Sequence, residues 1–366
     1  MQILTRLLAS RAPSPFRLGR NDFVTYTFGI TTHVWYLLSQ WVPETLTHSK
    51  RQDQKQVQDH YDRGNIVSVR DEAEDDFYGS FLGDRMIYTS GIALNGDENL
   101  EQMQDNKMNL VCNNIKLKKG ERHLDIGCGW GTLVNYAAKN FGSSSTGVTL
   151  AENQVRYGTS VSKKNGTEKN VRFLRMDYRD IPNEKFDKVT CLEMAEHVGV
   201  KNFQKFLCQV RELLEDDGAF YLQIAGLRRP FQYEDLVWGL FMAKYIFPGA
   251  DASMPLGWVI GQLELAGFEV QQVDTIGIHY SLTIKHWFDN WVKNKDKVVA
   301  KHGERWYRIF HLFLCWSTYI AGTGGATCFM ITSVKNRNAY NRKEMITQRL
   351  NGKNNATCVD ISKKGR

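Results

Sequence analysis

The chain has 366 residues, of which 42% are hydrophobic and 12% aromatic, enough to bury a large core. Its net charge of +7 lies at the ends, because residues 335–366 carry +7, residues 1–20 carry +4, and the middle is slightly acidic. This distribution argues against a nucleic-acid partner, which would require basic residues spread over a folded face.

The first 47 residues are predicted to be a basic N-terminus followed by a membrane-associating segment. Residues 1–20 are rich in arginine and lack acids, which is typical of a transit peptide or of a basic segment beside a membrane. Residues 23–42 carry no formal charge and are long enough to span a bilayer. Their threonines and aromatic residues favour an interfacial helix over a true span, and an ordinary docking helix is the alternative.

The cysteine content bears on the compartment. Seven cysteines without a C-x-x-C pair argue against a disulfide framework and against a zinc site, so we expect reduced thiols and no bound metal. Together with the N-terminal segment, this predicts a membrane-associated protein that faces the cytosol. The endoplasmic reticulum is the first expectation for its location, and the mitochondrion is the alternative.

Residues 48–120 are predicted to form a helical cap, and residues 121–334 an α/β domain with a parallel sheet. In the cap, a polar helix is expected at 50–61 and an amphipathic helix at 97–117. Strands are expected near 122–127, 144–149, 171–176, 186–192, 218–225, 268–274 and 325–334. Helices are expected near 130–140, 151–164, 201–214, 256–266, 284–300 and 303–320.

This alternation is typical of a mostly parallel sheet covered by helices on both faces. Residues 230–249 interrupt it with aromatic and apolar side chains, which predicts a helical insertion over the carboxyl ends of the strands. Residues 335–366 are expected to be a basic, disordered tail.

The most informative segment is LDIGCGWGT at residues 124–132, a buried strand that enters a glycine turn and opens a helix. Its glycines are spaced G-x-G-x-G rather than G-x-G-x-x-G, which argues against a dinucleotide-dependent oxidoreductase. Asp125, two residues before Gly127, suits a ligand that carries positive charge. The turn therefore suits the sulfonium and amino-acid end of S-adenosylmethionine (SAM), and a plain tight turn is the alternative.

Polar residues follow the next three predicted strands. Thr149 and Gln154 stand where an acid commonly holds ribose hydroxyls, although helix capping is the alternative. Tyr178 follows the third strand and could stack on adenine. Two acids and a histidine follow the fourth strand at 193–197, where burial is costly unless the charges are paired. A carboxylate there could accept a proton beside a sulfonium.

Taken together, these motifs resemble the family of cyclopropane fatty acid synthases and mycolic acid methyltransferases, SAM-dependent enzymes that methylate lipid double bonds. The resemblance runs from about His60 to Met330 and rests on segments 60–64, 76–78, 86–90, 124–131, 147–154 and 196–199. Segments that are similar to the fungal sphingolipid 9-methyltransferase branch are 193–197, 233–236, 247–253, 257–264 and 303–308. The family fold implied is a seven-stranded class I SAM-dependent methyltransferase (Rossmann-like) sheet with N-terminal helices.

The resemblance also implies roles for individual residues. Tyr88 and Thr89 match positions that close over SAM, and Tyr178 and Arg179 match neighbours of its adenine. The positions that match contacts to the methionine part are Gly127, Cys128 and Gly129. The positions that match contacts to the ribose are Thr149, Leu150, Ala151, Glu152, Asn153 and Gln154. The positions that match the cradle of a bicarbonate ion, used as general base by cyclopropane synthases, are Glu196 and Tyr280.

Three departures from the family pattern stand out. Cyclopropane synthases carry a cysteine at Ser90 and a histidine at Gln223, both in the bicarbonate cradle, so the cyclopropane product is in doubt for this chain. Residues 66–75 separate two segments that are contiguous in the family. Fungal relatives also carry longer hydrophobic N-terminal regions.

We therefore predict a SAM-dependent C-methyltransferase that acts on a lipid double bond, with carbon 9 of the sphingoid base of ceramide or glucosylceramide as the first candidate. The alternatives are a cyclopropane-fatty-acyl-phospholipid synthase, a small-molecule N-methyltransferase, and an inactive lipid-binding protein. Expected partners are a lipid substrate (ceramide or acyl chain) and a membrane surface. The sequence does not predict an oligomeric state.

Methylation of an alkene leaves a carbocation, which water would quench and aromatic faces can stabilise. The aromatic candidates are Phe77, Tyr78, Phe81, Trp238, Phe241, Tyr245, Trp287 and Trp291, with ordinary core packing as the alternative. A base that removes hydrogen from the methylated carbon yields a branched alkene, whereas removal from the new methyl group closes a ring.

Overall fold

The computed structural model describes residues 76–230, 233–337 and 339–342 of the chain. Within these residues, seven strands form one sheet in the order β3-β2-β1-β4-β5-β7-β6. The strands are β1 (Arg122–Ile126), β2 (Ser144–Thr149), β3 (Val171–Arg175), β4 (Phe186–Leu192), β5 (Leu214–Leu227), β6 (Phe268–Thr275) and β7 (Ala326–Lys335). Neighbouring strands are parallel, except that β7 is antiparallel to both β5 and β6. The predicted mostly parallel sheet is confirmed.

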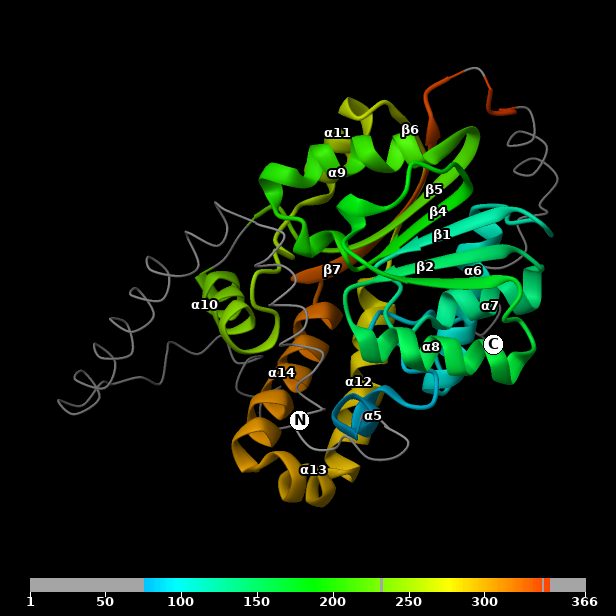
Figure 1. Cartoon of the computed structure of the whole chain (residues 1–366). Helices are drawn as coiled ribbons and strands as arrows, with labels where there is room; N and C mark the ends of the chain where they lie inside the picture. The colour runs from blue at the N-terminus through cyan, green and yellow to red at the C-terminus, as the bar shows by residue number, and fades with distance from the viewer. Residues whose placement is uncertain (1–75, 231–232, 338, 343–366) are drawn as a thin grey trace, which may run out of the picture.

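Helices cover both faces of the sheet (Figure 1). The helices on one face are α6 (Leu100–Asn114), α7 (Thr132–Phe141) and α8 (Glu152–Asn165), and those on the other are α9 (Val200–Leu213) and α11 (Leu256–Leu265). In β5, Phe220 and Leu222 pack into the core beside α9 and α11, whereas Tyr221 packs into the core beside α6 and α7. This alternation follows from the two-residue period of a strand and buries both faces.

A further layer of helices surrounds an aromatic cluster. These helices are α5 (Asp76–Leu82), α12 (Gly277–Lys293), α13 (Lys295–His302) and α14 (Glu304–Gly322). The predicted insertion is helical, since it comprises α10 (Tyr233–Phe241) and the π-helix η5 (Met242–Ile246). All eight aromatic residues proposed from the sequence to stabilise a cation lie in this cluster or pack against it. Five of them are buried in the cluster, whereas Trp238, Phe241 and Tyr245 are half-buried and pack against it.

The predicted helix at 284–300 differs from the structure at both ends. α12 begins at Gly277, seven residues before the predicted start. The sequence pattern missed its first turns because their buried residues are small or polar and form no apolar stripe. Ser281 donates to the carbonyl of Thr318 at 2.7 Å, a contact that hydrophobic periodicity does not reveal. The helix ends at Lys293. Its cap residue, Asn294, donates through its side-chain amide to the carbonyl of Ser80 at 2.8 Å, and α13 follows.

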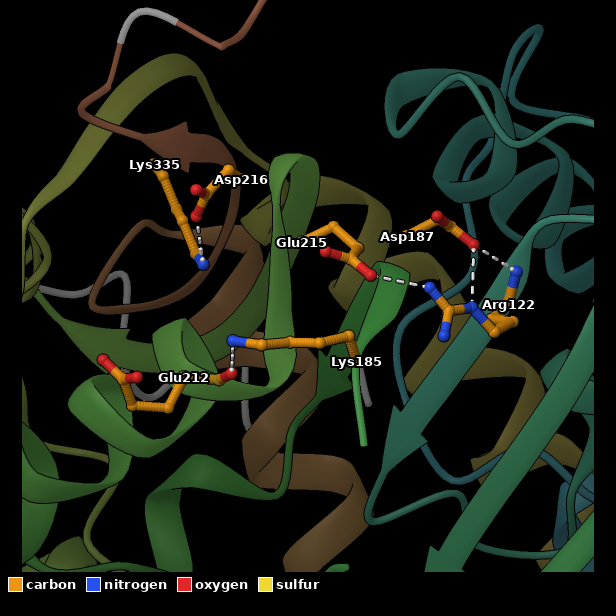
Figure 2. Close-up of polar contacts among 7 residues, drawn as sticks. All are labelled: Arg122, Lys185, Asp187, Glu212, Glu215, Asp216 and Lys335. Carbon is orange, nitrogen blue, oxygen red and sulfur yellow. Dashed lines mark hydrogen bonds and ion pairs between the residues drawn. The ribbon is translucent and has the colours of Figure 1, made fainter. Parts of the chain in front are cut away.

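Ion pairs join the strands at the end of the sheet where β1, β4 and β5 begin (Figure 2). The Arg122 guanidinium lies 3.4 Å from the carboxylate of Asp187 and 2.7 Å from that of Glu215. Lys335 pairs with Asp216 at 3.0 Å. β5 therefore starts at Leu214, earlier than the predicted strand at 218–225. Its acidic residues at 215–217 have the composition of a turn, but ion pairs of Glu215 and Asp216 hold them beside the neighbouring strands.

Several predictions lie partly or wholly outside the described residues: the segments 1–47, 50–61 and 66–75, and the tail beyond 342. Lys335 belongs to β7, and Arg342 pairs with Glu269 of β6, so the first part of the predicted tail packs on the sheet. None of the described helices is long and apolar enough to cross a membrane.

Candidate active site

A pocket opens where the carboxyl ends of β1 to β4 meet, the edge at which open α/β sheets bind ligands. It brings together most of the residues that the sequence analysis assigns to SAM. Those that line it are Tyr88, Thr89, Asp125, Gly127, Cys128, Gly129, Thr149, Leu150, Gln154, Tyr178 and Arg179. The aromatic wall is completed by Trp130.

The glycine turn has a backbone that L-residues rarely adopt. Gly127, Gly129 and Gly131 all have positive φ values, of 77°, 53° and 75°. A Cβ atom at Gly127 would lie 2.4 Å from the side chain of Met194, and one at Gly131 would lie 2.4 Å from Phe173. A Cβ atom at Gly129 would meet no atom of the described residues within 4 Å. The turn is therefore packed from behind at two glycines and open at the third, where it lines the pocket.

Asp125 and Lys107 place opposite charges in the pocket. Asp125 is buried and accepts a hydrogen bond from the hydroxyl of Thr190 at 2.7 Å, and burial raises its pKa to about 6. Lys107 donates to the hydroxyl of Thr89 at 2.5 Å, and burial lowers its pKa to about 8. This pair is complementary to the ammonium and carboxylate groups of an amino acid, the chemistry that one end of SAM presents.

The residues predicted to contact ribose divide into two groups. The hydroxyl of Thr149 donates to Oε1 of Gln154 at 2.6 Å, and both residues line the pocket with Leu150. The predicted residues that are not among the pocket lining are Ala151, Glu152 and Asn153. Ala151 caps the start of α8, and the Glu152 carboxylate pairs with two surface arginines instead.

Tyr178 and Arg179 lie on η3 (Tyr178–Asp180), a short turn that follows β3. The guanidinium of Arg179 lies 5.1 Å from the centre of the Tyr178 ring and pairs with Asp177 at 2.6 Å. Asp177 also accepts the backbone N–H of Arg179 at 2.9 Å. These contacts hold an aromatic face and a planar cation at the pocket wall, as the adenine prediction requires.

Three of the four residues predicted for catalysis surround the carboxylate of Glu193, which the sequence analysis did not assign. The backbone N–H of Ser90 donates to Oε1 at 3.1 Å, and the amide nitrogen of Gln223 donates to the same oxygen. The hydroxyl of Tyr280 donates to Oε2 at 2.6 Å. The Ser90 hydroxyl donates to the carbonyl of Gly91 instead, so this residue contributes its backbone rather than its side chain.

The fourth predicted residue, Glu196, lies on η4 (Ala195–His197) and is 5% exposed. Its Oε1 accepts the backbone N–H of Ala225 at 2.6 Å, and its Oε2 has no hydrogen-bond partner among the described residues. Burial raises the pKa of Glu196 to about 8, and the nearby charge of Glu193 adds to the effect. Glu196 is not among the residues that line the pocket, whereas Glu193 is.

The sequence analysis gave no individual role to two pocket residues, Glu193 and Lys107, although each had a signal. Glu193 directly follows β4, at the same carboxyl edge of the sheet where Asp125 and Thr149 lie near the ends of β1 and β2. Lys107 lies on α6 between the buried residues Met103 and Val111, so it interrupts an apolar stripe at helical spacing. A lysine there is either a surface residue at a boundary or a buried charge with a partner.

The family model for mycolic acid cyclopropane synthetase matches residues 48–330. The chain belongs to this family. Sphingolipid C9-methyltransferase A of Emericella nidulans is 52% identical over 94% of this chain and 66% of that protein. The sphingolipid C9-methyltransferase of Komagataella phaffii is 50% identical over 90% of this chain and 67% of that protein. The chain thus spans about two thirds of the length of these relatives.

Solved structures agree with the fold. The cyclopropane synthase MmaA2 from Mycobacterium tuberculosis is 24% identical, with a TM-score of 0.71 over 77% of this chain and 98% of that one. The mycolic acid cyclopropane synthase CmaA1, complexed with SAH and CTAB, matches with the same TM-score at 23% identity. The family resemblance and the class I methyltransferase fold predicted from the sequence are both confirmed.

Proposed function

We propose that this chain is a SAM-dependent C-methyltransferase that methylates carbon 9 of the sphingoid base of ceramide or glucosylceramide. The observation that carries the proposal is one pocket that is lined both by the glycine turn with Asp125 and by Glu193. The names of the relatives at 50% and 52% identity support the choice of a sphingolipid.

The chain's own residues suit the donor. SAM supplies a methyl group on a positively charged sulfur when it is bound. Gly129 leaves room for a ligand against the backbone of the turn, and Asp125 and Lys107 match the two charges of an amino-acid end. Thr149 and Tyr178 lie on the wall beyond the turn, where they would hold the ribose and the adenine.

The apolar side of the pocket suits an alkene. Tyr88 lines the pocket, and its ring centre lies 5.7 Å from that of Phe247 and 5.4 Å from that of Trp287. These rings continue into the aromatic cluster, which excludes water from the side on which a carbocation would form. Rings of this kind stabilise a neighbouring cation by about 0.5–2 kcal/mol each.

We also propose that the protein works at a membrane surface that faces the cytosol, at the endoplasmic reticulum first and the mitochondrion as the alternative. Leu236 and Val237 of α10 are 51% and 50% exposed, and the six cysteines among the described residues are free. Sedimentation with liposomes tests the surface part. Leu236→Ser with Val237→Ser should weaken liposome binding, whereas Leu265→Ser, at a lone exposed leucine of α11, should not.

The direct test of the activity is incubation of the purified chain with methyl-labelled SAM and a ceramide that carries an 8-double bond in its sphingoid base. Mass spectrometry should find a methyl-branched, still unsaturated base. Label in phospholipid acyl chains with an unlabelled ceramide would identify a cyclopropane synthase instead. Methylation of water-soluble amines would identify an N-methyltransferase, and SAM binding without turnover on any lipid would identify an inactive lipid-binding protein.

A further inference from the structure

The hydrogen-bond donors that the family resemblance assigns to bicarbonate are directed at Glu193 in this protein. Ser90 and Gln223 donate to one carboxylate oxygen, and Tyr280 donates to the other. The thiol of Cys328, on β7, lies 3.7 Å from the first oxygen. These groups come from four separate parts of the chain, so the cradle is built around this carboxylate.

Bicarbonate does not fit beside the carboxylate of Glu193. Two buried oxygens next to it, Oε1 of Gln223 and Oε2 of Glu196, have no hydrogen-bond partner among the described residues. Both side chains are at least nine-tenths buried. The amide oxygen of Gln223 is an acceptor, and together with an ionised Glu193 it would repel a second anion, whereas a neutral Glu196 supplies no positive charge to hold one.

We propose that Glu193 is the general base of lipid methylation in this protein, in the place that bicarbonate occupies in cyclopropane synthases. The inference rests on the proposed function. The carbon–sulfur bond of the donor breaks as its methyl carbon bonds to carbon 9, which leaves carbon 8 electron-deficient. Glu193 then removes the hydrogen of carbon 9, and the electron pair of that C–H bond restores the double bond. The proton remains on the carboxyl group until it exchanges with water.

The surroundings divide the two neighbouring carboxyl groups into one base and one neutral acid. Burial raises the pKa of Glu193, and the three donors and the nearby charge of Lys107 oppose this rise by stabilising the ionised form. Glu196 has one donor and an unpartnered oxygen, so burial raises its pKa to about 8 and it is protonated at neutral pH. The other titratable groups that face the pair are Tyr280, Cys328, Cys191 and Asp251. Burial keeps the phenol and the thiols neutral by raising their pKa values, and the charge of Asp251 raises the pKa of Glu196 further. Two neighbouring carboxyl groups that differ in protonation state because their environments differ are typical of acid–base sites.

The backbone of Glu193 has a strained conformation. Its φ of 56° is unusual for a residue with a side chain, and such strain persists only where the surroundings hold it. The backbone N–H of Glu193 donates to the carbonyl of Gln223 at 2.8 Å, which fixes the residue to β5. Glycine adopts this conformation without strain, so Glu193→Gly should fold.

The first test compares Glu193→Gln with the matched control Glu215→Gln, which lies in the ion pairs at the opposite end of the sheet. The substrates are methyl-labelled SAM and an 8-unsaturated ceramide in phosphatidylcholine vesicles. Glu193→Gln should lower kcat by about 10²–10⁴-fold, the usual contribution of a general base. SAM affinity, measured by calorimetry, should change less than about threefold in both variants. A Glu193→Gln enzyme that keeps a third of its activity overturns the inference.

The second test is rescue of Glu193→Gly by a small carboxylate. Removal of the side chain empties the cradle, so added formate or bicarbonate should restore part of the lost rate, whereas chloride should not. The wild-type enzyme should work equally well in buffer freed of carbon dioxide. A wild-type rate that rises with bicarbonate would overturn the inference.

The third test follows the hydrogen atoms. With SAM that carries a trideuterated methyl group, the product should retain all three deuterium atoms, and deuterium placed at carbon 9 of the ceramide should be lost. Loss of one deuterium from the methyl group would show ring closure and overturn this base assignment. Wild-type enzyme that methylates no ceramide would overturn the proposed function itself, and the inference with it.

Discussion

At the scale of single residues, burial and local partners decide which groups carry charge. Glu193 and Glu196 are separated by one short turn, yet one carboxylate has several donors and the other has one. The sequence contains both acids but does not distinguish them, because the donors come from distant segments. The assignment of the base to Glu193 therefore required the structure, whereas the existence of an acidic site at 193–197 could be predicted.

Glu196→Gln is expected to change how stability depends on pH. The folded-state pKa of about 8 lies above the ordinary value of 4.5, so the folded protein binds an extra proton between these values and loses stability as pH rises through them. The variant lacks this group. Its melting temperature relative to wild type should therefore increase from pH 5 to pH 8. A constant difference across that range would contradict a neutral, buried Glu196.

Substitutions in the glycine turn should separate ligand binding from folding. Gly129→Ala introduces a strained φ and a methyl group into the pocket, so SAM affinity should fall by more than about tenfold in calorimetry. Gly166→Ala has similar strain at the end of α8, with no atom of the described residues near its Cβ position, and is the matched control. Both should lose about 1–2 kcal/mol of unfolding free energy. Equal SAM affinities for the two variants would contradict the placement of the donor.

At the scale of elements, the sequence pattern predicted the central strands well because β1, β2 and β4 are buried on both faces. β2 and β4 begin and end where the sequence pattern places them. α12 was placed too late in the chain, because its buried first turns use glycine, serine and threonine rather than apolar residues. The error matters, since it moves Tyr280 from a connecting segment to the first turns of a helix.

Tyr280→Phe tests how α12 contributes to the site. The variant removes the 2.6 Å hydrogen bond to Glu193, so the pKa of that carboxyl group should rise further. The acidic limb of the pH–rate profile should move to higher pH by about one to two units, since a hydrogen bond to a charged group contributes about 1.5–3 kcal/mol. Tyr319→Phe, on α14, is the matched control. A profile that falls in height without moving would indicate a purely structural role.

At the scale of the whole molecule, the two ends of the sheet carry different kinds of residue. The carboxyl ends of the strands carry the pocket, and the opposite end carries exposed ion pairs around Arg122. The sequence pattern alone does not predict the order of the strands, because pairing between distant segments leaves no local signal. The family resemblance supplied the architecture instead, and the structure agrees with it.

Arg122→Ala should affect folding but not binding. Its side chain is about half exposed, so loss of its ion pairs should lower the unfolding free energy by about 0.5–1 kcal/mol in urea titrations at low salt. The difference should shrink in about 1 M salt, where the charges are screened. SAM affinity should match wild type. A large loss of affinity would show that the two ends of the sheet are coupled.

The position of β7 between β5 and β6 has a consequence for how the protein is made. Among the described strands it is the last to leave the ribosome, yet two earlier strands depend on it for their hydrogen bonds. A nascent polypeptide that stops before residue 326 exposes two open strand edges, which invite association with other chains. Translation must therefore pass residue 335 before β7 can pair with both β5 and β6. Premature termination there should give insoluble protein rather than a shorter enzyme.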